Sequence, residues 1–262
     1  MGYFEAFLIG LVQGLTEFLP ISSSAHLVIV PEMAGYGSPP VEVDIAVHLA
    51  TLLAVVTYFA RDLWGLIKGI GTTEGRRVLG LLALATLPAA ILGFLLEDFF
   101  EDLADDPTSA AAQLLVNAGI LFVAERWSRP TFPHDISNAL NVPIAATVGA
   151  AQAVSILPGI SRSGATISAG MLLGLPRDTA ARFSFLLSIP IIAGTVAAKS
   201  PDLLNSEQVT SGPGLVAFGT AAVVGFVAIW GLLRLLRTRT LYPFAWYCVV
   251  FGVFSIVWFA VT

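Results

Sequence analysis

Six apolar stretches, most of them long enough to cross a lipid bilayer as a helix, constrain what this chain can fold into. They cover about residues 42–60, 76–96, 109–125, 183–199, 213–236 and 243–261. A helix needs about 20 apolar residues to cross roughly 30 Å of hydrocarbon. Only 12% of the 262 residues are charged, whereas a typical soluble domain has about 25%. The sequence therefore predicts an all-α integral membrane protein with six transmembrane helices.

Two further apolar regions are too short or too broken to span the bilayer. Residues 3–12 lead to Glu17, a proline and a serine run, and a short apolar piece follows at about 25–31. Residues 140–157 and 162–175 flank a second break, which reads LPGISRSG. Irregular backbone at membrane depth is tolerated only where protein or a water-filled cavity satisfies its polar groups. We therefore expect each region to form a re-entrant hairpin of two half-length helices.

The order of these segments predicts an internal repeat within one membrane domain, 1–262. A hairpin followed by three spans occurs twice, with repeat one at about 1–126 and repeat two at about 138–262. Because each half has three spans, the second half must insert upside down relative to the first. Inverted-topology repeats with broken helices are a known membrane architecture, and their site is expected where the repeats meet.

The basic residues give the orientation. On the proposed topology one side holds an acidic stretch at 97–106, Asp202 and Glu207, with Lys199 as its one base. By the positive-inside rule the opposite, basic side is cytoplasmic, so the first hairpin enters from outside. The net charge of −5 argues against a nucleic-acid partner. The bases on the cytoplasmic side are Arg61, Lys68, Arg76, Arg77, Arg126, Arg129, Arg177, Arg182, Arg234, Arg237 and Arg239.

The first break carries a carboxylate inside apolar sequence. A charge at the membrane centre costs about 2.5–3.5 kcal/mol on insertion scales, so a functional site is the default interpretation. Gln13 and Glu17 are four residues apart and share a helix face. They could hold a hard cation such as Mg²⁺ or Ca²⁺, because Mg²⁺ favours few carboxylates together with substrate phosphates. The alternative is a hydrogen bond across the helix bundle.

The serines that follow have two interpretations as well. Ser22, Ser23 and Ser24 can cap the next half-helix, or a spare hydroxyl at the helix start can face an anion. His26 lies three residues after Ser23. A serine–histidine pair for nucleophilic or general acid–base chemistry is therefore possible, and a structural role for His26 is the alternative.

The second break carries an arginine at the start of a half-helix. A guanidinium suits bidentate phosphate recognition, and backbone N–H groups at a helix start favour anions. Glycines on either side permit close approach of backbone to a ligand. The alternative is that Arg162 forms a structural ion pair with Glu17, which would still join the two hairpins. The other candidate substrate-binding residues here are Gly159, Ser161, Ser163, Gly164 and Thr166.

At these residues the chain resembles a known family. The segments QGLTEFLPISSSAH, VDIAVHLATLLAVV, PGISRSGAT and RFSFLLSIP are similar, in the same order, to those of the undecaprenyl-pyrophosphate phosphatase family of the bacitracin-resistance type. The resemblance implies a multi-pass plasma-membrane phosphatase with an outward-facing site and a dimeric state. It would remove the terminal phosphate of a polyprenyl pyrophosphate, which recycles the lipid carrier for cell-envelope glycan synthesis.

The resemblance also implies roles for particular residues. The family's paired acidic motif falls on Gln13 and Glu17, and its serine–histidine motif falls on Ser23 and His26. Its PGxSRSxxT motif covers the second break, with Arg162 as the phosphate ligand. Gln13 departs from the glutamate that many members carry, which weakens a two-carboxylate metal site.

A second departure lies at Arg182, where many members carry glutamate, so any role of that position is open.

The expected mechanism combines the chemistry of these residues with what the family resemblance implies. Arg162 and the neighbouring hydroxyls hold the pyrophosphate and offset its developing charge, while Glu17, with Gln13, binds a divalent cation. His26 acts as general acid or base, and Ser23 either attacks phosphorus or orients water. A polyprenyl-phosphate flippase or a secondary transporter is the alternative, because inverted repeats with broken helices are also transporter architecture.

Overall fold

The computed structural model describes residues 1–95, 106–157, 159–199 and 206–261. Most of the acidic stretch at 97–106, Asp202 and Pro158 of the second break lie outside the described residues.

Helices make up the regular structure of the described chain, which confirms the all-α prediction. Six of them are long and apolar enough to cross a membrane. They agree with the six predicted stretches to within a few residues at almost every end. These helices are α3 (Val41–Tyr58), α5 (Thr73–Leu95), α7 (Pro107–Trp127), α11 (Arg177–Lys199), α13 (Gly212–Leu236) and α14 (Tyr242–Val261).

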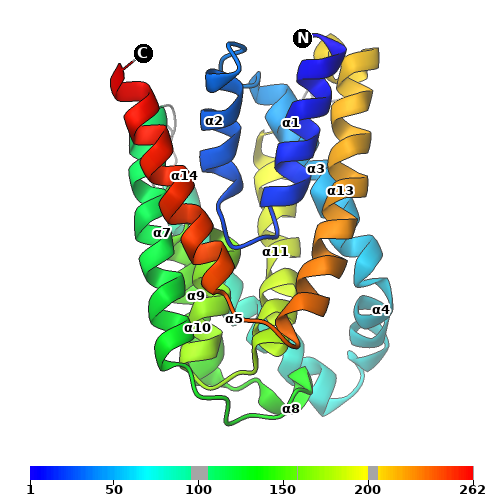
Figure 1. Ribbon diagram of the computed structural model, residues 1–262. Coiled ribbons are helices and arrows are strands. Elements are labelled where there is room, and N and C mark those ends of the chain that lie inside the picture. The colour runs from blue at the N-terminus through cyan, green and yellow to red at the C-terminus, as the bar shows by residue number, and fades with distance from the viewer. Residues whose placement is uncertain (96–105, 158, 200–205, 262) are drawn as a thin grey trace.

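The two broken regions form the predicted hairpins. Helices α1 (Tyr3–Thr16) and α2 (Ser23–Met33) enter from one end of the bundle, and the turn that joins them lies near the middle of its length (Figure 1). Helices α9 (Val142–Val154) and α10 (Arg162–Leu172) enter from the other end, and each hairpin is followed by three spans. The order and direction of the helices are therefore those of an inverted-topology repeat, in which the two turns meet inside the protein.

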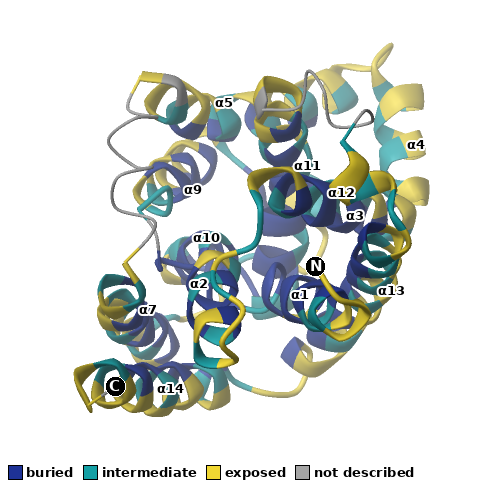
Figure 2. Cartoon of the chain, turned by 90° about the horizontal axis from the view of Figure 1, so that it is seen from above, coloured by how far each residue is buried: buried dark blue, intermediate teal, exposed yellow. Residues whose placement is uncertain are grey.

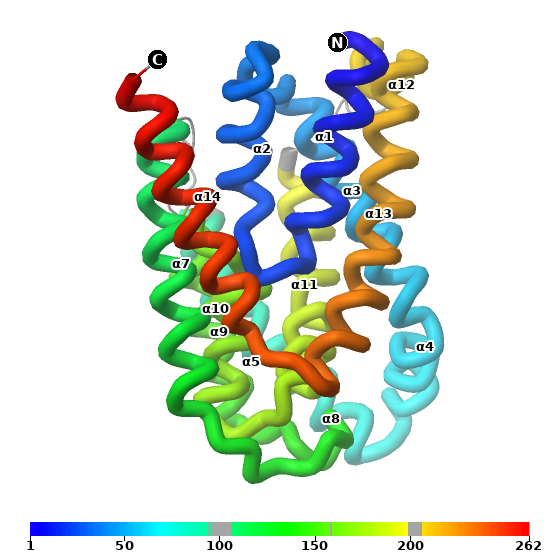
Figure 3. The backbone as a smooth tube through the Cα atoms, viewed as in Figure 1, coloured from blue at the N-terminus to red at the C-terminus, as the bar shows by residue number. Residues whose placement is uncertain are grey.

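Three short helices occur where the sequence analysis expected only connecting segments. Helix α4 (Ala60–Gly69) falls within the basic segment between the first two spans, and it has no buried residue. Helices α8 (Ile136–Ala139) and α12 (Glu207–Thr210) have one turn each. The tube in Figure 3 shows α4 and α8 at the basic end of the bundle and α12 at the opposite end.

Glycines bring the half-helices close to their neighbours in both halves. A Cβ atom added to Gly14 of α1 would lie 2.8 Å from Cβ of Val224 on α13. In the other half, a Cβ atom on Gly149 of α9 would lie 2.8 Å from the carbonyl oxygen of Ala85 on α5. Small residues let helix backbones approach closely in membranes. Each hairpin is therefore packed tightly against a span of the opposite repeat.

The hairpin turns need unusual backbone. Ser22 has φ of +71° and Gly159 has φ of +89°; a serine in this region carries strain of roughly 1–3 kcal/mol. A Cβ atom on Gly159 would lie 3.0 Å from the carbonyl oxygen of Ala110 on α7. The hydroxyl of Ser161 accepts a hydrogen bond from the N–H of Gly164 (3.0 Å) and so caps α10.

The basic end of the bundle is held by ion pairs. Arg177 at the start of α11 pairs with the buried Glu125 of α7, and Glu125 also accepts the N–H of Leu241 (2.9 Å). Arg182 pairs with Asp62 of α4 (2.5 Å). The structure thus gives Arg182, whose role was open, a carboxylate partner at the end of the bundle.

Candidate active site

A cavity of about 610 Å³ lies where the two hairpins meet, and α3, α5 and α11 complete its wall. Seen from above, buried residues of α1, α2, α3, α10 and α11 face the middle of the molecule (Figure 2). The polar residues of the lining come from both hairpins, from α3 and from α11. They are Glu17, Ser22, Ser23, Ser24, Asp44, His48, Gln152, Ser155, Ser161, Arg162 and Thr195.

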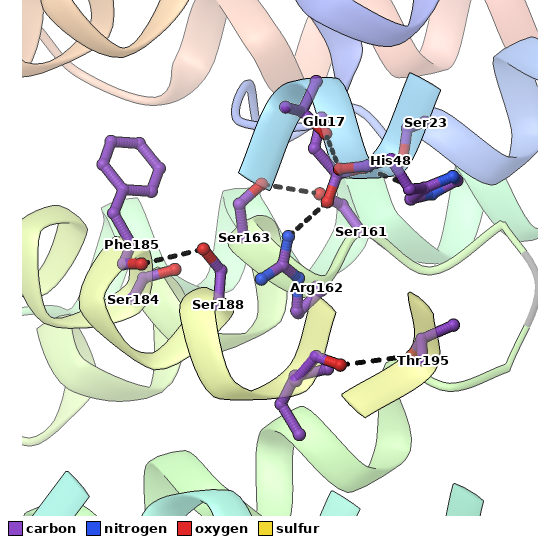
Figure 4. A network of polar contacts seen from close by, with 12 residues as sticks. Glu17, Ser23, His48, Ser161, Arg162, Ser163, Ser184, Phe185, Ser188 and Thr195 are labelled. Carbon is purple, nitrogen blue, oxygen red and sulfur yellow. Dashed lines mark hydrogen bonds and ion pairs between the residues drawn. The ribbon is translucent and has the colours of Figure 1, made fainter. Parts of the chain in front are cut away.

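Glu17 is the centre of the polar cluster (Figure 4). Its side chain is only 5% exposed and forms an ion pair with Nη2 of Arg162. Its Oε2 accepts hydrogen bonds from Oγ of Ser23 (2.6 Å) and Nε2 of Gln13 (3.2 Å). Glu17 is therefore held by one residue of the other hairpin and two of its own.

Arg162 keeps a free donor beside this cluster. Its Nη2 is used by Glu17, whereas Nη1 is buried and has no hydrogen-bond partner among the described residues. A buried donor without a partner costs about 1–3 kcal/mol. Because Arg162 lines the cavity, this donor can be satisfied by an anion bound there.

Arg162 thus forms the ion pair that was the alternative interpretation, and it is also the residue predicted to bind phosphate. The guanidinium has five N–H donors, so pairing with Glu17 leaves capacity for a ligand.

Three of the predicted substrate-binding residues, Ser22, Ser24 and Ser161, line the cavity. Their hydroxyls already make contacts: Ser22 Oγ lies 3.1 Å from Ser24 Oγ, and Ser161 Oγ lies 3.0 Å from Ser163 Oγ. Both pairs can turn a hydroxyl hydrogen toward a bound anion.

The structure places the other predicted substrate-binding residues outside the cavity lining, where several of them contact other protein groups. Ser163 donates to the carbonyl oxygen of Leu19 (3.0 Å), and the N–H of Gly159 donates to Oγ of Ser24 (3.3 Å). Thr166 lies 2.7 Å from Ser184 Oγ on α11. These groups join the hairpins to each other and to α11. The set outside the lining is Gln13, Gly159, Ser163, Gly164 and Thr166, all described by the structure.

The predicted Ser23–His26 pair is not formed. Nδ1 of His26 donates to the carbonyl oxygen of Ser22 (2.7 Å), and Nε2 lies 2.8 Å from the hydroxyl of Tyr247. The imidazole stacks on Phe251 at 4.7 Å between ring centroids. Both ring nitrogens are therefore occupied, and His26 packs against α14 instead of lining the cavity.

The histidine that does line the cavity is His48 of α3, to which the sequence analysis gave no role. Its Nε2 lies 3.7 Å from Oε2 of Glu17, and its Nδ1 lies 2.9 Å from the carbonyl oxygen of Asp44. An ionisable side chain within an apolar span is a signal of function, and that signal could have identified His48.

Asn117 of α7 is a second residue that sequence reasoning missed. It is fully buried, its Nδ2 donates to the carbonyl oxygen of Pro20 (2.9 Å), and its Oδ1 accepts the N–H of Ser161 (3.2 Å). One amide thus binds the turn of each hairpin, which fixes the position of Ser23 relative to Arg162.

Two carboxylates, Glu17 and Asp44, line the cavity in the described chain, and only Glu17 lies beside the Gln13 amide. Among the described residues no group of three or more histidine, cysteine, aspartate or glutamate side chains is arranged to hold a metal ion. Oε1 of Gln13, beside Glu17, is buried without a hydrogen-bond partner in the described chain. These donors suit a cation that takes most of its ligands from phosphate and water, as Mg²⁺ does.

The comparison with known families decides the chain's membership. The model of the family described as "Bacitracin resistance protein BacA" matches residues 6–254. The chain belongs to this family.

Several full-length relatives of the chain carry the same name. A protein of Alcanivorax borkumensis named undecaprenyl-diphosphatase is 42% identical over 269 residues, which cover 99% of this chain and 100% of the relative. Proteins of the same name from Desulforudis audaxviator and Elusimicrobium minutum are 40% and 42% identical, over 98% and 97% of this chain and 98% and 96% of the relatives.

Proposed function

We propose that this protein is an integral membrane phosphatase that hydrolyses a polyprenyl diphosphate, of the undecaprenyl type, to the monophosphate and inorganic phosphate. The observation that carries the proposal is the free Nη1 of Arg162 beside the hydrogen-bonded Ser23–Glu17 pair in one cavity. The name shared by the full-length relatives supports the substrate class.

The diphosphate is held by positive charge and by hydroxyl groups. Arg162 supplies a guanidinium donor, and Ser22, Ser24 and Ser161 supply hydroxyls from both hairpins. Phosphoryl transfer depends mainly on positioning and on electrostatic stabilisation of the phosphoryl oxygens. Residues of both repeats therefore bind the reacting diphosphate.

Ser23 is the nucleophile in this proposal. Its hydroxyl donates to Glu17 at 2.6 Å, so Glu17 can accept the proton as Oγ attacks the terminal phosphorus. The bond from that phosphorus to the bridging oxygen breaks, and polyprenyl monophosphate leaves.

Water then attacks the phosphoserine and gives its proton to His48, whose Nε2 lies 3.7 Å from Oε2 of Glu17, and Ser23 Oγ leaves with the proton that Glu17 returns. Direct attack by a water that Ser23 orients is the competing route, and it leaves no covalent intermediate. The two routes differ in whether phosphate is ever bound to the protein chain.

A divalent cation, Mg²⁺ in the first instance, would be held by Glu17 and the Gln13 amide oxygen together with phosphate oxygens. When bound it would neutralise phosphate charge. The negative charge of Glu17 is already shared with Arg162 and Ser23, so the cation would arrive with the diphosphate.

The lipid tail leaves the site along the apolar part of the same cavity. This part is lined by Ala89 and Ala90 of α5, Ile156, and Ile192 and Val196 of α11. The cavity is also lined by Asp44 near the start of α3 and by Gly93 and Ala198 near the ends of α5 and α11. These helix ends lie at the end of the bundle opposite the basic residues (Figure 1). The positive-inside rule assigns that end to the outside, which supports our proposal of an outward-facing site in the plasma membrane.

The test is phosphate release by purified protein in detergent, where no gradient exists. We expect inorganic phosphate from a long-chain polyprenyl diphosphate and a lower rate with chelator. A protein that binds the lipid but releases no phosphate under any divalent cation would support the flippase or transporter instead.

A further inference from the structure

A second cavity, of about 130 Å³, lies at the basic end of the bundle between α3, α11 and α13. Three arginines line it, Arg182, Arg234 and Arg237, beside the rings of Trp230 and Tyr58. It shares no lining residue with the active-site cavity. The proposed phosphatase chemistry therefore makes no use of it.

The charges in this second cavity are not balanced. Arg182 pairs with Asp62 at 2.5 Å. Asp178, the one carboxylate of the lining, accepts a hydrogen bond from His134 at 2.8 Å.

The other two arginines have no carboxylate partner within ion-pair distance in the described part of the chain. The guanidinium of Arg234 lies 5.7 Å from the ring centroid of Trp230. Arg234 lies in the last turn of α13, and Arg237 caps its end in helical conformation. The spacing of three residues places them on one face of the helix. They leave a concentrated positive charge in the cavity.

The position of the cavity indicates which anion it would meet. The basic end faces the cytoplasmic leaflet by the positive-inside rule, and tryptophans gather at the level of lipid headgroups. Trp230 is 51% exposed, and Trp64 of the neighbouring α4 is 58% exposed. Basic pockets between transmembrane helices on this side bind phosphate headgroups, and a guanidinium is suited to phosphate.

We propose that this cavity is a binding site for the phosphate headgroup of an anionic phospholipid of the cytoplasmic leaflet. Arg234 and Arg237 contact the phosphate, and Arg182 fixes one wall through Asp62. The acyl chains lie along the lipid-facing side of α13, where Val223 and Val227 are 66% and 54% exposed.

The experiment compares lipid binding by two variants of the full chain with the same change in charge. Arg234→Gln/Arg237→Gln removes the two unpaired arginines, and Arg126→Gln/Arg129→Gln removes two arginines from the same end outside the cavity. Binding of phosphatidylglycerol is titrated by native mass spectrometry, with phosphatidylcholine as the neutral lipid. Unfolding temperatures in lipid-free detergent verify that each variant folds, and Arg237→Gln alone replaces the double variant if it does not.

We expect roughly 30-fold weaker binding of phosphatidylglycerol to the Arg234/Arg237 variant, from the contribution of two arginines near the membrane surface. The control variant should bind within about threefold of wild type, and phosphatidylcholine should not distinguish the three proteins. Equal losses in both variants, or none in either, would overturn the proposal. Inorganic phosphate that displaces phosphatidylglycerol at millimolar concentration would also overturn it, because the site would then recognise free phosphate.

Discussion

The ion pair between Glu17 and Arg162 can be tested separately for its structural and its chemical role. It joins two hairpins that are 145 residues apart in sequence, and its side chains are 5% and 16% exposed. Removing one partner of a buried pair costs about 3–5 kcal/mol, because the other charge stays buried without compensation. Replacing both by uncharged residues of similar size is often neutral.

Arg162→Met should therefore lower the free energy of unfolding by about 3–5 kcal/mol. Glu17→Gln combined with Arg162→Met should recover most of this loss, because Gln keeps a group for the hydrogen bonds of Ser23 and Gln13. Thermal or denaturant unfolding in detergent measures both variants against wild type and Glu17→Gln.

Phosphate release should follow a different pattern. Arg162→Met and the double variant should both be inactive, because each lacks the donor that holds the diphosphate. A double variant that regains activity with its stability would refute the phosphate-binding role and leave a purely structural pair. An Arg162→Met variant as stable as wild type would refute the energetic argument.

Four further outcomes follow from the structure. Asn117→Asp should lower kcat for phosphate release by about tenfold with little change in KM, because the side chain loses the donor to the carbonyl oxygen of Pro20. As a control, Ser168→Ala should keep wild-type activity and stability, because the buried Ser168 hydroxyl has no partner in the described chain. Gly159→Ala should lower the free energy of unfolding, measured with denaturant, by roughly 1–3 kcal/mol, because Gly159 has a positive φ and lies against α7. His26→Phe should lower the free energy of unfolding by about 1–3 kcal/mol, since the Ser22 carbonyl and the Tyr247 hydroxyl lose their partner. Chelator should reduce phosphate release and added Mg²⁺ should restore it; full activity in chelator would contradict the role of the cation.

The membrane fold is largely readable from the sequence because lipid imposes one requirement on every span. A run of about 20 apolar residues is needed to cross the bilayer, and backbone interrupted by proline and serine has to be enclosed by protein. These two conditions identify the spans and both hairpins. Helix α4 is missed because it is amphipathic and has no buried residue, so the span criterion does not apply to it.

The candidate site is only partly readable, because side-chain direction depends on distant elements. Ser23 and His26 are three residues apart, yet Ser23 turns to Glu17 and His26 turns to Tyr247, which lies 221 residues away. Nothing local to α2 indicates that α14 packs there. The bonds of Asn117 to both turns are likewise long-range, at 97 and 44 residues.

The most direct test of the central claim compares two adjacent serines in the first turn. Ser23 donates to Glu17, whereas Ser24 contacts Ser22 and the N–H of Gly159. Initial rates of phosphate release from polyprenyl diphosphate should fall roughly 10³-fold or more in Ser23→Ala, as for loss of a nucleophile, and less than about tenfold in Ser24→Ala. Equal rates in the two variants, or near-wild-type activity in Ser23→Ala, would contradict the claim that the Ser23–Glu17 pair performs the chemistry.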